Sequence, residues 1–302
     1  MVMSLSANVL QIENLVKEYP EGGGVHGLSL DIAPGTSFGL LGPNGAGKST
    51  TLKMIMGLLR PASGSVSVLG HDVLAHPEQV RRLTGYVPEH QRMYPWMTVA
   101  QIIRFVRAFY PTWDQAFCLS LLDEYGLSAT KQVSELSNGM QTKLALVLAL
   151  AHSPAFLVLD EPTTGLDPLV REEFLEKVRA LVQARRCTVL FSSHIMSDID
   201  QIADTIGIMN DGRLLVVEHR EALLGRTRRI AVKLEIADST GLAPQGTIFE
   251  NQQDGRWHLT VHGFSDATME ELHAKNRIRE ATVSAPSLED VMKAFVKGAR
   301  AV

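Results

Sequence analysis

Short apolar runs alternate with helical patterns along the first three quarters of the chain. Residues 9–41 read as short strands separated by glycine and proline turns, and residues 156–159 and 188–191 are all-apolar strands. Residues 49–59 carry apolar positions at helical spacing. Continuous apolar strands that alternate with helices are typical of a parallel sheet buried on both faces. This part of the chain is therefore predicted to be α/β, with a largely parallel sheet.

A predominantly helical block interrupts that alternation. Between residues 81 and 151 the pattern is mostly helical, with apolar residues at helical spacing in residues 99–110, 116–125 and 139–152. We interpret this block, about residues 90–150, as a helical subdomain inserted into the α/β core.

Alternating strand patterns follow residue 225. They cover residues 230–236, 247–251 and 256–261. The pair Asp254-Gly255 lies between the last two and is a strong hairpin signal. The sequence thus predicts a second, smaller sheet in this region.

Ser287 and Asp290 resemble a capping box that opens a final helix over residues 288–296. With the preceding strands, this helix makes residues 226–302 a small α+β accessory domain, for which the sequence indicates no chemistry of its own. Dimer contacts or regulation are the roles expected of it. The rest of the chain, residues 1–225, forms the main domain.

Composition excludes several classes of protein. The chain has 302 residues, 45% of them hydrophobic and 21% charged, with a formal net charge of -4, which is typical of a globular chain rather than a disordered one. The slight acidity gives no electrostatic reason to expect a nucleic acid as partner. Cys118 and Cys187 lie far apart without a CxxC pattern, which argues against a disulfide framework or zinc cage and favours a reducing, intracellular setting.

Membrane and export signals are also missing from the pattern. The longest clean apolar run, residues 144–151, is far shorter than the roughly 20 residues that span a bilayer. Residues 1–10 carry no basic segment before an apolar core and do not resemble a signal peptide. We therefore expect a soluble chain, or one that reaches a membrane only through a partner.

A glycine-rich segment lies between the strand that ends near residue 41 and the helix that follows. It matches GxxxxGK[ST], the phosphate-loop pattern, in which backbone N–H groups and a helix N-terminus surround phosphate oxygens. Lys48 is positioned to reach the β- and γ-phosphates, and the Ser49 hydroxyl to ligate Mg²⁺; the alternative is a chance glycine-rich turn. The residues predicted to contact nucleotide here are Gly42, Pro43, Asn44, Gly45, Ala46, Gly47, Lys48, Ser49 and Thr50.

Two adjacent carboxylates, Asp160 and Glu161, end the apolar strand at residues 156–159. Strands of a parallel sheet deliver their C-terminal residues to the ligand crevice. Asp160 is predicted to hold Mg²⁺, and Glu161, pointing the other way by strand alternation, to polarise the attacking water. The alternative is a solvated loop start, which explains poorly why the apolar run leads straight into Asp-Glu-Pro.

The order of the remaining motifs resembles that of the ATP-binding-cassette (ABC) ATPases. Residues 136–141, Leu-Ser-Asn-Gly-Met-Gln, are similar to the LSGGQ signature, residues 164–168 to the D-loop, and residues 192–194 to the switch-histidine motif. Tyr19 matches the aromatic residue that stacks on adenine, and Glu89 stands in the position of the Q-loop. The resemblance extends over roughly residues 8–225.

This resemblance implies ATP and Mg²⁺ as cofactors and a head-to-tail dimer of two cassettes. Ser137 and Gly139 would meet the γ-phosphate of the ATP held by the other cassette, and Asp167 would couple the two sites. His194 would contact the γ-phosphate and orient the water or Glu161. With a single nucleotide site in the chain, the second cassette is a copy of this chain or a related one.

Two departures from the family pattern bear on the site. Glu89 stands where most members have glutamine, and its extra charge could ligate Mg²⁺ directly while it acts at the catalytic centre. In the signature, Asn138 replaces glycine and Met140 replaces glutamine. Asparagine tolerates a left-handed backbone best among non-glycine residues, so we expect the signature geometry to survive.

The resemblance also implies a separate membrane permease and a location on the cytoplasmic face of the inner membrane. Residues 93–97, Met-Tyr-Pro-Trp-Met, pack locally or form a groove for a permease helix. Residues 286–291 and 110–114 resemble bacterial exporter cassettes of the ABC-2 type, including the YtrB-like group. An importer cassette, a soluble ABC ATPase that remodels macromolecules, and a nucleotide-gated docking module without activity remain alternatives.

Overall fold

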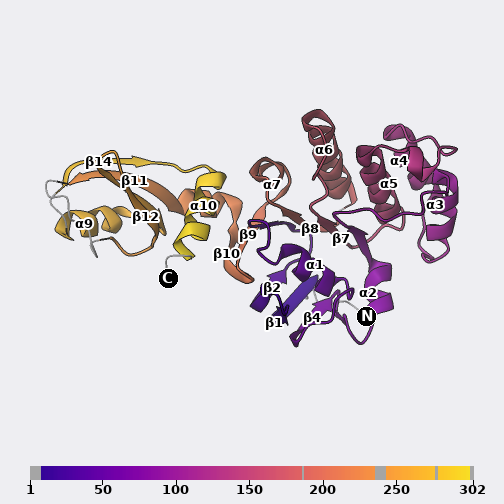
Figure 1. Cartoon of the computed structure of the whole chain (residues 1–302), viewed down its shortest axis with the longest axis horizontal. Coiled ribbons are helices and arrows are strands. Elements are labelled where there is room, and N and C mark those ends of the chain that lie inside the picture. Colours follow the sequence, from indigo (N-terminus) through magenta and orange to yellow (C-terminus); the bar gives the residue numbers. More distant parts are fainter. Residues whose placement is uncertain (1–7, 186, 235–242, 276–277, 300–302) are drawn as a thin grey trace.

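Three sheets and ten α-helices organise the part of the chain that the computed structural model describes, residues 8–185, 187–234, 243–275 and 278–299. The prediction for residues 1–10 falls largely on residues outside this range. Figure 1 shows an elongated molecule. The helices α3 (Val99–Arg107), α4 (Gln115–Glu124) and α5 (Asn138–Leu150) lie at one end, and the strands that follow residue 226 lie at the other.

The central sheet has the strand order β10-β9-β3-β8-β7-β6, in which all neighbours run parallel except β10. Its middle strands are buried along their whole length, as their apolar sequences predict. The strands are β3 (Ser37–Leu41), β6 (Thr84–Val87), β7 (Phe156–Asp160), β8 (Thr188–Ser193), β9 (Thr205–Asn210) and β10 (Arg213–His219).

The expectation of a mostly helical block from residue 81 onwards is wrong at its start. β6 lies within that block and pairs with β7 in parallel, from Thr84 opposite Phe156 to Val87 opposite Leu159. Its four residues owe their conformation to this distant partner strand, which local periodicity does not reveal.

A second, antiparallel sheet has the strand order β2-β1-β4-β5. Its buried residues share one apolar cluster with the face of the central sheet that carries Phe38 and Phe156. The strands are β1 (Leu10–Glu18), β2 (Gly24–Ile32), β4 (Ser63–Val68) and β5 (His71–Asp72).

Helices cover the central sheet and form the predicted helical subdomain. Thr98 and Asp114 cap the first two subdomain helices through their side chains, and the Thr98 cap is a reciprocal box with Gln101. None of the described helices is long and apolar enough to cross a membrane. The helices of the first 226 residues are α1 (Lys48–Ile55), α2 (Pro77–Leu83), α3 (Val99–Arg107), α4 (Gln115–Glu124), α5 (Asn138–Leu150), α6 (Pro168–Arg185), α7 (Met196–Ile202) and α8 (Arg220–Arg226).

The third sheet is antiparallel, has the order β12-β13-β11-β14, and draws all its strands from residues beyond 226. The three predicted strands are present with altered ends, although residues 235–236 of the first prediction lie outside the described residues. β14 and the helix before it were not predicted. The elements are β11 (Thr227–Leu234), β12 (Thr247–Gln253), β13 (Arg256–His262), α9 (Asp266–Lys275), β14 (Ile278–Ser284) and α10 (Leu288–Ala299).

The final helix, α10, joins the third sheet to the rest of the molecule. The predicted capping box is confirmed, because the Ser287 Oγ accepts from the Asp290 N–H at 3.2 Å and an Asp290 carboxylate oxygen accepts from the Ser287 N–H at 3.1 Å. Leu288 and Val291 are buried in the same apolar cluster as Ile199 of α7. The other side of α10 faces β12, so the helix contacts both parts of the chain.

Candidate functional site

The glycine-rich segment wraps tightly at the start of α1. Gly45 and Gly47 have φ of 83° and 99°, which favours glycine. A Cβ on Gly47 would stand 2.6 Å from the Gly24 carbonyl oxygen, so the loop has no room for a side chain there. Gly47 caps α1 without a side-chain hydrogen bond, which leaves amide groups at the helix start available to an anion.

Lys48 is nearly buried and is held across the mouth of this loop. Its Nζ donates to the carbonyl oxygens of Gly42 at 2.8 Å and Pro43 at 3.2 Å. The same ammonium lies 3.1 Å from a carboxylate oxygen of Glu161, and both side chains are about 5% exposed. The loop lysine and the second carboxylate after β7 therefore form a buried ion pair.

Asp160 lies at the C-terminal end of β7, as predicted, and faces the loop helix. Its Oδ1 accepts from the Ser49 Oγ and from the Ser192 Oγ, each at 2.9 Å. Burial raises the pKa of Asp160, the two serine hydrogen bonds oppose that rise, and the charges of Glu89 and Glu161 add to it. The Asp160 carboxylate and the Ser49 hydroxyl that contacts it are oxygen ligands of the kind that Mg²⁺ prefers.

Strand alternation predicted that Glu161 points away from Asp160, and this prediction is wrong. The strand ends at Asp160, and Glu161 takes a φ of 44°, which turns its carboxylate towards Lys48. The Glu161 N–H donates to the Ser192 Oγ at 3.0 Å. This left-handed turn brings both carboxylates to the same site.

His194 meets the same carboxylate from the loop after β8. Its Nδ1 lies 2.7 Å from Glu161 Oε2, and its backbone N–H donates to that oxygen at 3.4 Å. The Thr164 hydroxyl also donates to it, at 3.5 Å. Glu161 is thus fixed between an ammonium and an imidazole.

These groups line one cavity of about 650 Å³. Tyr19 is 40% exposed at its edge, and its hydroxyl lies 3.4 Å from the Thr50 Oγ1. The predicted residues Gly42, Pro43 and Asp160 do not line the cavity themselves, but each forms a hydrogen bond with Lys48 or Ser49, which do. Sequence reasoning missed the contribution of residues 22–24, although their three consecutive glycines were visible as a turn. The lining comprises Tyr19, Gly22, Gly23, Gly24, Asn44, Gly45, Ala46, Gly47, Lys48, Ser49, Thr50, Glu89, Glu161, Thr164 and His194.

Besides Gly42, Pro43 and Asp160, three more predicted residues lie outside this cavity lining: Ser137, Gly139 and Asp167. Ser137 caps α5, and its Oγ accepts from the Met140 N–H at 3.3 Å, with Gly139 in the first turn. Asp167 precedes α6 and accepts from the Val170 N–H at 3.1 Å. The chain by itself therefore does not bring these residues to the phosphate loop.

The tolerance of asparagine for a left-handed backbone is not used at Asn138. Asn138 is the first residue of α5 and is not among the described residues with positive φ. Its replacement of glycine is tolerated because the position is right-handed helix, not because asparagine accepts a left-handed one.

Comparison with known proteins agrees with this geometry. Residues 25–164 match the family model described as ABC transporter. The chain is 39% identical over 214 residues to the Nod factor export ATP-binding protein I of Burkholderia pseudomallei (strain 1710b), a match that covers 69% of this chain and 70% of that protein.

Two further matches extend the picture. The bacitracin transport ATP-binding protein BcrA of Bacillus licheniformis is 29% identical over 302 residues, covering 97% of this chain and 98% of that protein, so it matches the third sheet as well. A solved structure of the ATP-binding subunit of an ABC transporter superposes with a TM-score of 0.65 at 29% identity, covering 71% of this chain and 91% of the other.

Proposed function

Because the chain belongs to the ABC transporter family and is an ATP hydrolase of the transport-coupled kind, we propose that it powers export through a separate membrane permease. The observation that carries this proposal is the single cavity in which Lys48, Glu161 and His194 meet. The alternative without activity, a nucleotide-gated docking module, does not account for an oriented carboxylate and imidazole at a phosphate loop.

In the proposed site, each residue has one task. Lys48 and the amides of its loop bind the β- and γ-phosphates, and Tyr19 stacks on the adenine. Ser49, Asp160 and Glu89 would hold Mg²⁺, which supplies charge neutralisation at the phosphates when bound. Glu161 accepts a proton from the attacking water while His194 keeps its carboxylate oriented.

We further propose that ATP joins two cassettes. Ser137, Gly139 and Asp167 are remote from the chain's own phosphate loop, and Ser137 opens a helix whose N-terminal end attracts anions. In a head-to-tail dimer these residues would meet the nucleotide of the second cassette, a copy of this chain or a related one. Hydrolysis would then remove the charge that holds the dimer together.

An exposed aromatic cluster beside a groove supports a permease contact. Tyr94, Trp96 and Phe105 are 43%, 66% and 42% exposed, and the ring centroid of Tyr94 lies 5.2 Å from that of Trp96 and 5.7 Å from that of Phe105. The adjoining groove of about 300 Å³ is lined by residues that include Met93, so the segment at residues 93–97 is only partly used in local packing. Exposed aromatic and methionine side chains favour partner helices.

The direction of transport rests on the relatives. The Nod factor export and bacitracin transport proteins are named for the movement of specific compounds, and the second of these aligns over nearly the whole chain. We therefore favour an exporter at the cytoplasmic face of the inner membrane, with an importer cassette as the second candidate.

Purification of the tagged chain from membranes tests the proposal. We expect an integral membrane protein to co-elute, Trp96→Ser to lose it, and ATPase activity to persist in that variant. Leu74→Ser, which alters a similarly exposed apolar residue (48%) outside the cluster, is the matched control. Co-elution that is unchanged by Trp96→Ser would refute the docking site, and absence of ATPase activity would refute the function.

A further inference from the structure

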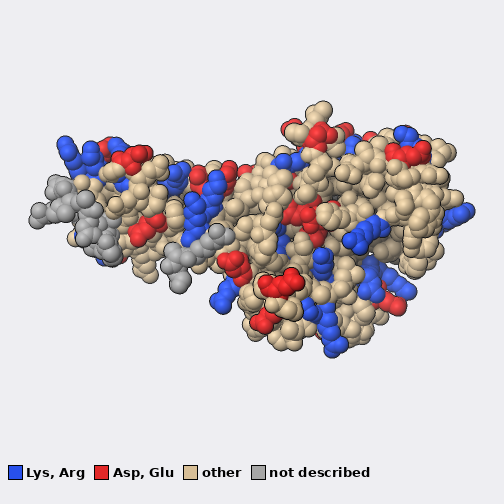
Figure 2. Space-filling model, in the orientation of Figure 1, with Lys and Arg blue, Asp and Glu red and all other residues tan. Residues whose placement is uncertain are grey.

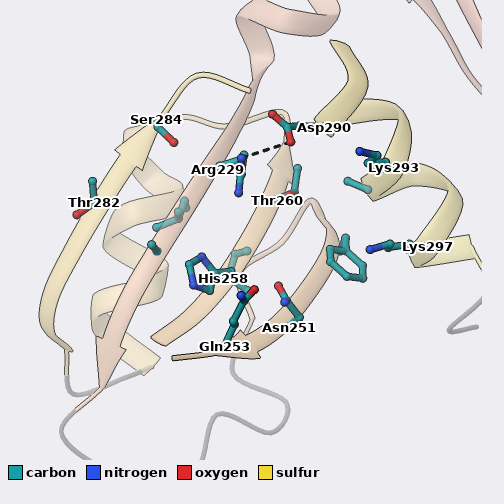
Figure 3. Close-up of a pocket in the computed structure, with 15 residues that line it drawn as sticks. Arg229, Asn251, Gln253, His258, Thr260, Thr282, Ser284, Asp290, Lys293 and Lys297 are labelled. Atoms are coloured by element: carbon teal, nitrogen blue, oxygen red, sulfur yellow. Dashed lines mark ion pairs between the residues drawn. The ribbon is translucent and has the colours of Figure 1, made fainter. Parts of the chain in front are cut away.

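A second polar cavity, of about 410 Å³, lies between the third sheet and α10 (Figure 3). It shares no lining residue with the nucleotide cavity. Its volume falls in the range of small-molecule sites. Nothing in the proposed ATP chemistry uses it.

The strand register forms the floor of this cavity. Arg229 of β11 lies between Thr260 of β13 and Ser284 of β14. Two residues further along β11, Ala231 lies between His258 of β13 and Thr282 of β14. Side chains two residues apart share a face, so the small Ala231 leaves a hollow between larger polar neighbours.

Apolar residues on the opposite face of this sheet bury against α9. Ile230, Val232 and Leu272 belong to one cluster, with exposed fractions of 1%, 0% and 0%. The apolar core of the third sheet therefore lies on the α9 side. The polar side chains line the opposite face of the sheet, where residues of α10 form one side of the cavity.

Basic side chains gather around the opening. Lys293 and Lys297, one turn apart on α10, line the cavity with Arg229, and Figure 2 shows basic residues gathered over this helix. Arg229 lies 3.3 Å from Asp290, which is the only carboxylate among the described lining residues. Arg229 and Lys293 each have a carboxylate partner, Asp290 and Glu289, so among the described lining residues one cation, Lys297, is left without one.

Of the three cations, Lys297 has the fewest negative charges near it among the described residues. Its Nζ stands 5.4 Å from the ring centroid of Phe249, which orients it over the cavity wall. Lys293 pairs with Glu289 on the outer side of α10 at 2.5 Å. No carboxylate in the described ranges lies within ion-pair distance of Lys297.

We propose that this cavity binds a small phosphate-bearing anion. A phosphomonoester carries close to two negative charges at neutral pH, so it can pair with Lys297 and take the place of the carboxylates that Arg229 and Lys293 now contact, while its remaining oxygens need hydrogen-bond donors. Lys293, Lys297 and Arg229 bind the phosphate, while the amides of Asn251 and Gln253 and the ring of His258 meet the polar remainder of the ligand. The expectation of an accessory domain without chemistry of its own would then be wrong.

A free metabolite and a lipid headgroup both supply this chemistry, and glycerol 3-phosphate represents both. The experiment is a calorimetric titration of the full chain with glycerol 3-phosphate. It is carried out in a Lys48→Ala background, because the phosphate loop is itself a phosphate site. Flotation with phosphatidylcholine vesicles, with and without phosphatidic acid, whose headgroup is a phosphomonoester, forms the second arm.

The test variant replaces Lys293 and Lys297 together by glutamine, which keeps their length. We expect affinity to fall roughly tenfold for each lysine lost, and the remaining binding to weaken with added salt. Lys275→Gln is the matched control. Like Lys293, Lys275 forms an ion pair with a glutamate four residues earlier, Glu271 at 2.5 Å, but it lies on α9, on the other side of the sheet. Thermal melts of both variants verify that the fold is retained.

Each outcome decides the proposal. Binding of glycerol 3-phosphate that the double variant loses supports a free ligand. Flotation only with phosphatidic acid, again lost in the double variant, supports the same chemistry with a lipid as its source. Absence of binding in both arms, or an equal loss in Lys275→Gln, overturns it.

Discussion

Glu161 contacts both the lysine and the histidine of the nucleotide cavity. One carboxylate oxygen lies 3.1 Å from the Lys48 ammonium and the other 2.7 Å from the His194 ring nitrogen. A carboxylate held in this way is oriented before substrate arrives, which is what general-base catalysis requires. The roles of these residues in hydrolysis are proposals that single substitutions can test.

Replacing Glu161 by glutamine keeps the shape and removes the base. We expect kcat for ATP to fall about 10²- to 10⁴-fold while ATP binding is retained, measured by steady-state kinetics and nucleotide titration. Glu172→Gln, on the exposed side of α6, makes the same change outside the cavity and should leave both unchanged. Full activity in Glu161→Gln would remove Glu161 from the mechanism.

His152 gives a second test at the residue scale, through pH. It is 2% exposed, stacks on Tyr110 with ring centroids 4.0 Å apart, and burial lowers its pKa from 6.5 to about 4. Between pH 6.5 and pH 4 the unfolded chain binds a proton at His152 and the folded chain does not. Protonation of His152 therefore leaves the free energy of unfolding unchanged above pH 6.5 and lowers it as the pH falls towards 4, by about 3 kcal/mol in total.

His152→Phe retains the stacking and cannot be protonated. We expect denaturant unfolding of this variant to lose that part of the pH dependence. His273→Phe at an exposed position of α9 is the control and should follow the unsubstituted chain. If all three unfolding profiles have the same slope below pH 6.5, His152 is not the group that titrates.

At the scale of elements, Asp198 ties α6, α7 and the loop after β7 together. It is fully buried, and its two oxygens accept from Thr163 Oγ1 and from Arg171 Nε, each at 2.5 Å. Thr163 follows Glu161 closely, and α7 follows His194. The position of the two site residues therefore depends on this one carboxylate.

Asp198→Asn removes the charge that Arg171 needs. Because it leaves a largely buried cation without its partner, we expect a loss of about 3 kcal/mol in the free energy of unfolding. Asp200→Asn makes the same change two residues on, where the side chain is 48% exposed and 3.8 Å from Arg220, and should cost less than about 1 kcal/mol. Equal losses in denaturant melts would contradict the role given to Asp198.

The elements that local patterns specify were predictable. The phosphate loop, the all-apolar strand before Asp160 and the capping box at Ser287 each lie in one short segment. β6 was not predictable, because its pairing partner is the distant β7. The direction of Glu161 was missed for a related reason: the alternation of a strand stops where the strand stops, and the φ of 44° depends on packing around it.

At the scale of the whole molecule, α10 links the third sheet to the main domain. Leu288 and Val291 enter the apolar cluster that also holds Ile199, Ile202 and Ile206. Burial of this surface couples the folding of the two parts. The division at residue 226 that we propose is thus one of sequence and topology rather than of independent stability.

Val291→Ala tests that link. Val291 is fully buried, and its truncation should lower the free energy of unfolding by about 2 kcal/mol, with a single transition in thermal melts. Val283→Ala removes the same atoms from a residue that is 41% exposed on β14 and should change stability by less than about 0.5 kcal/mol. A second, independent transition in the unsubstituted chain would argue against coupling.

The ion pair of Lys48 and Glu161 has a consequence for the empty enzyme. In the proposed site the γ-phosphate and Glu161 would compete for one ammonium, so part of the binding energy of ATP would be used to displace the carboxylate. The proposed base would then be freed from Lys48 only when the substrate binds. Glutamine at this position is uncharged and competes less for the ammonium, so the ATP binding retained by Glu161→Gln should be at least as tight as that of the unsubstituted chain.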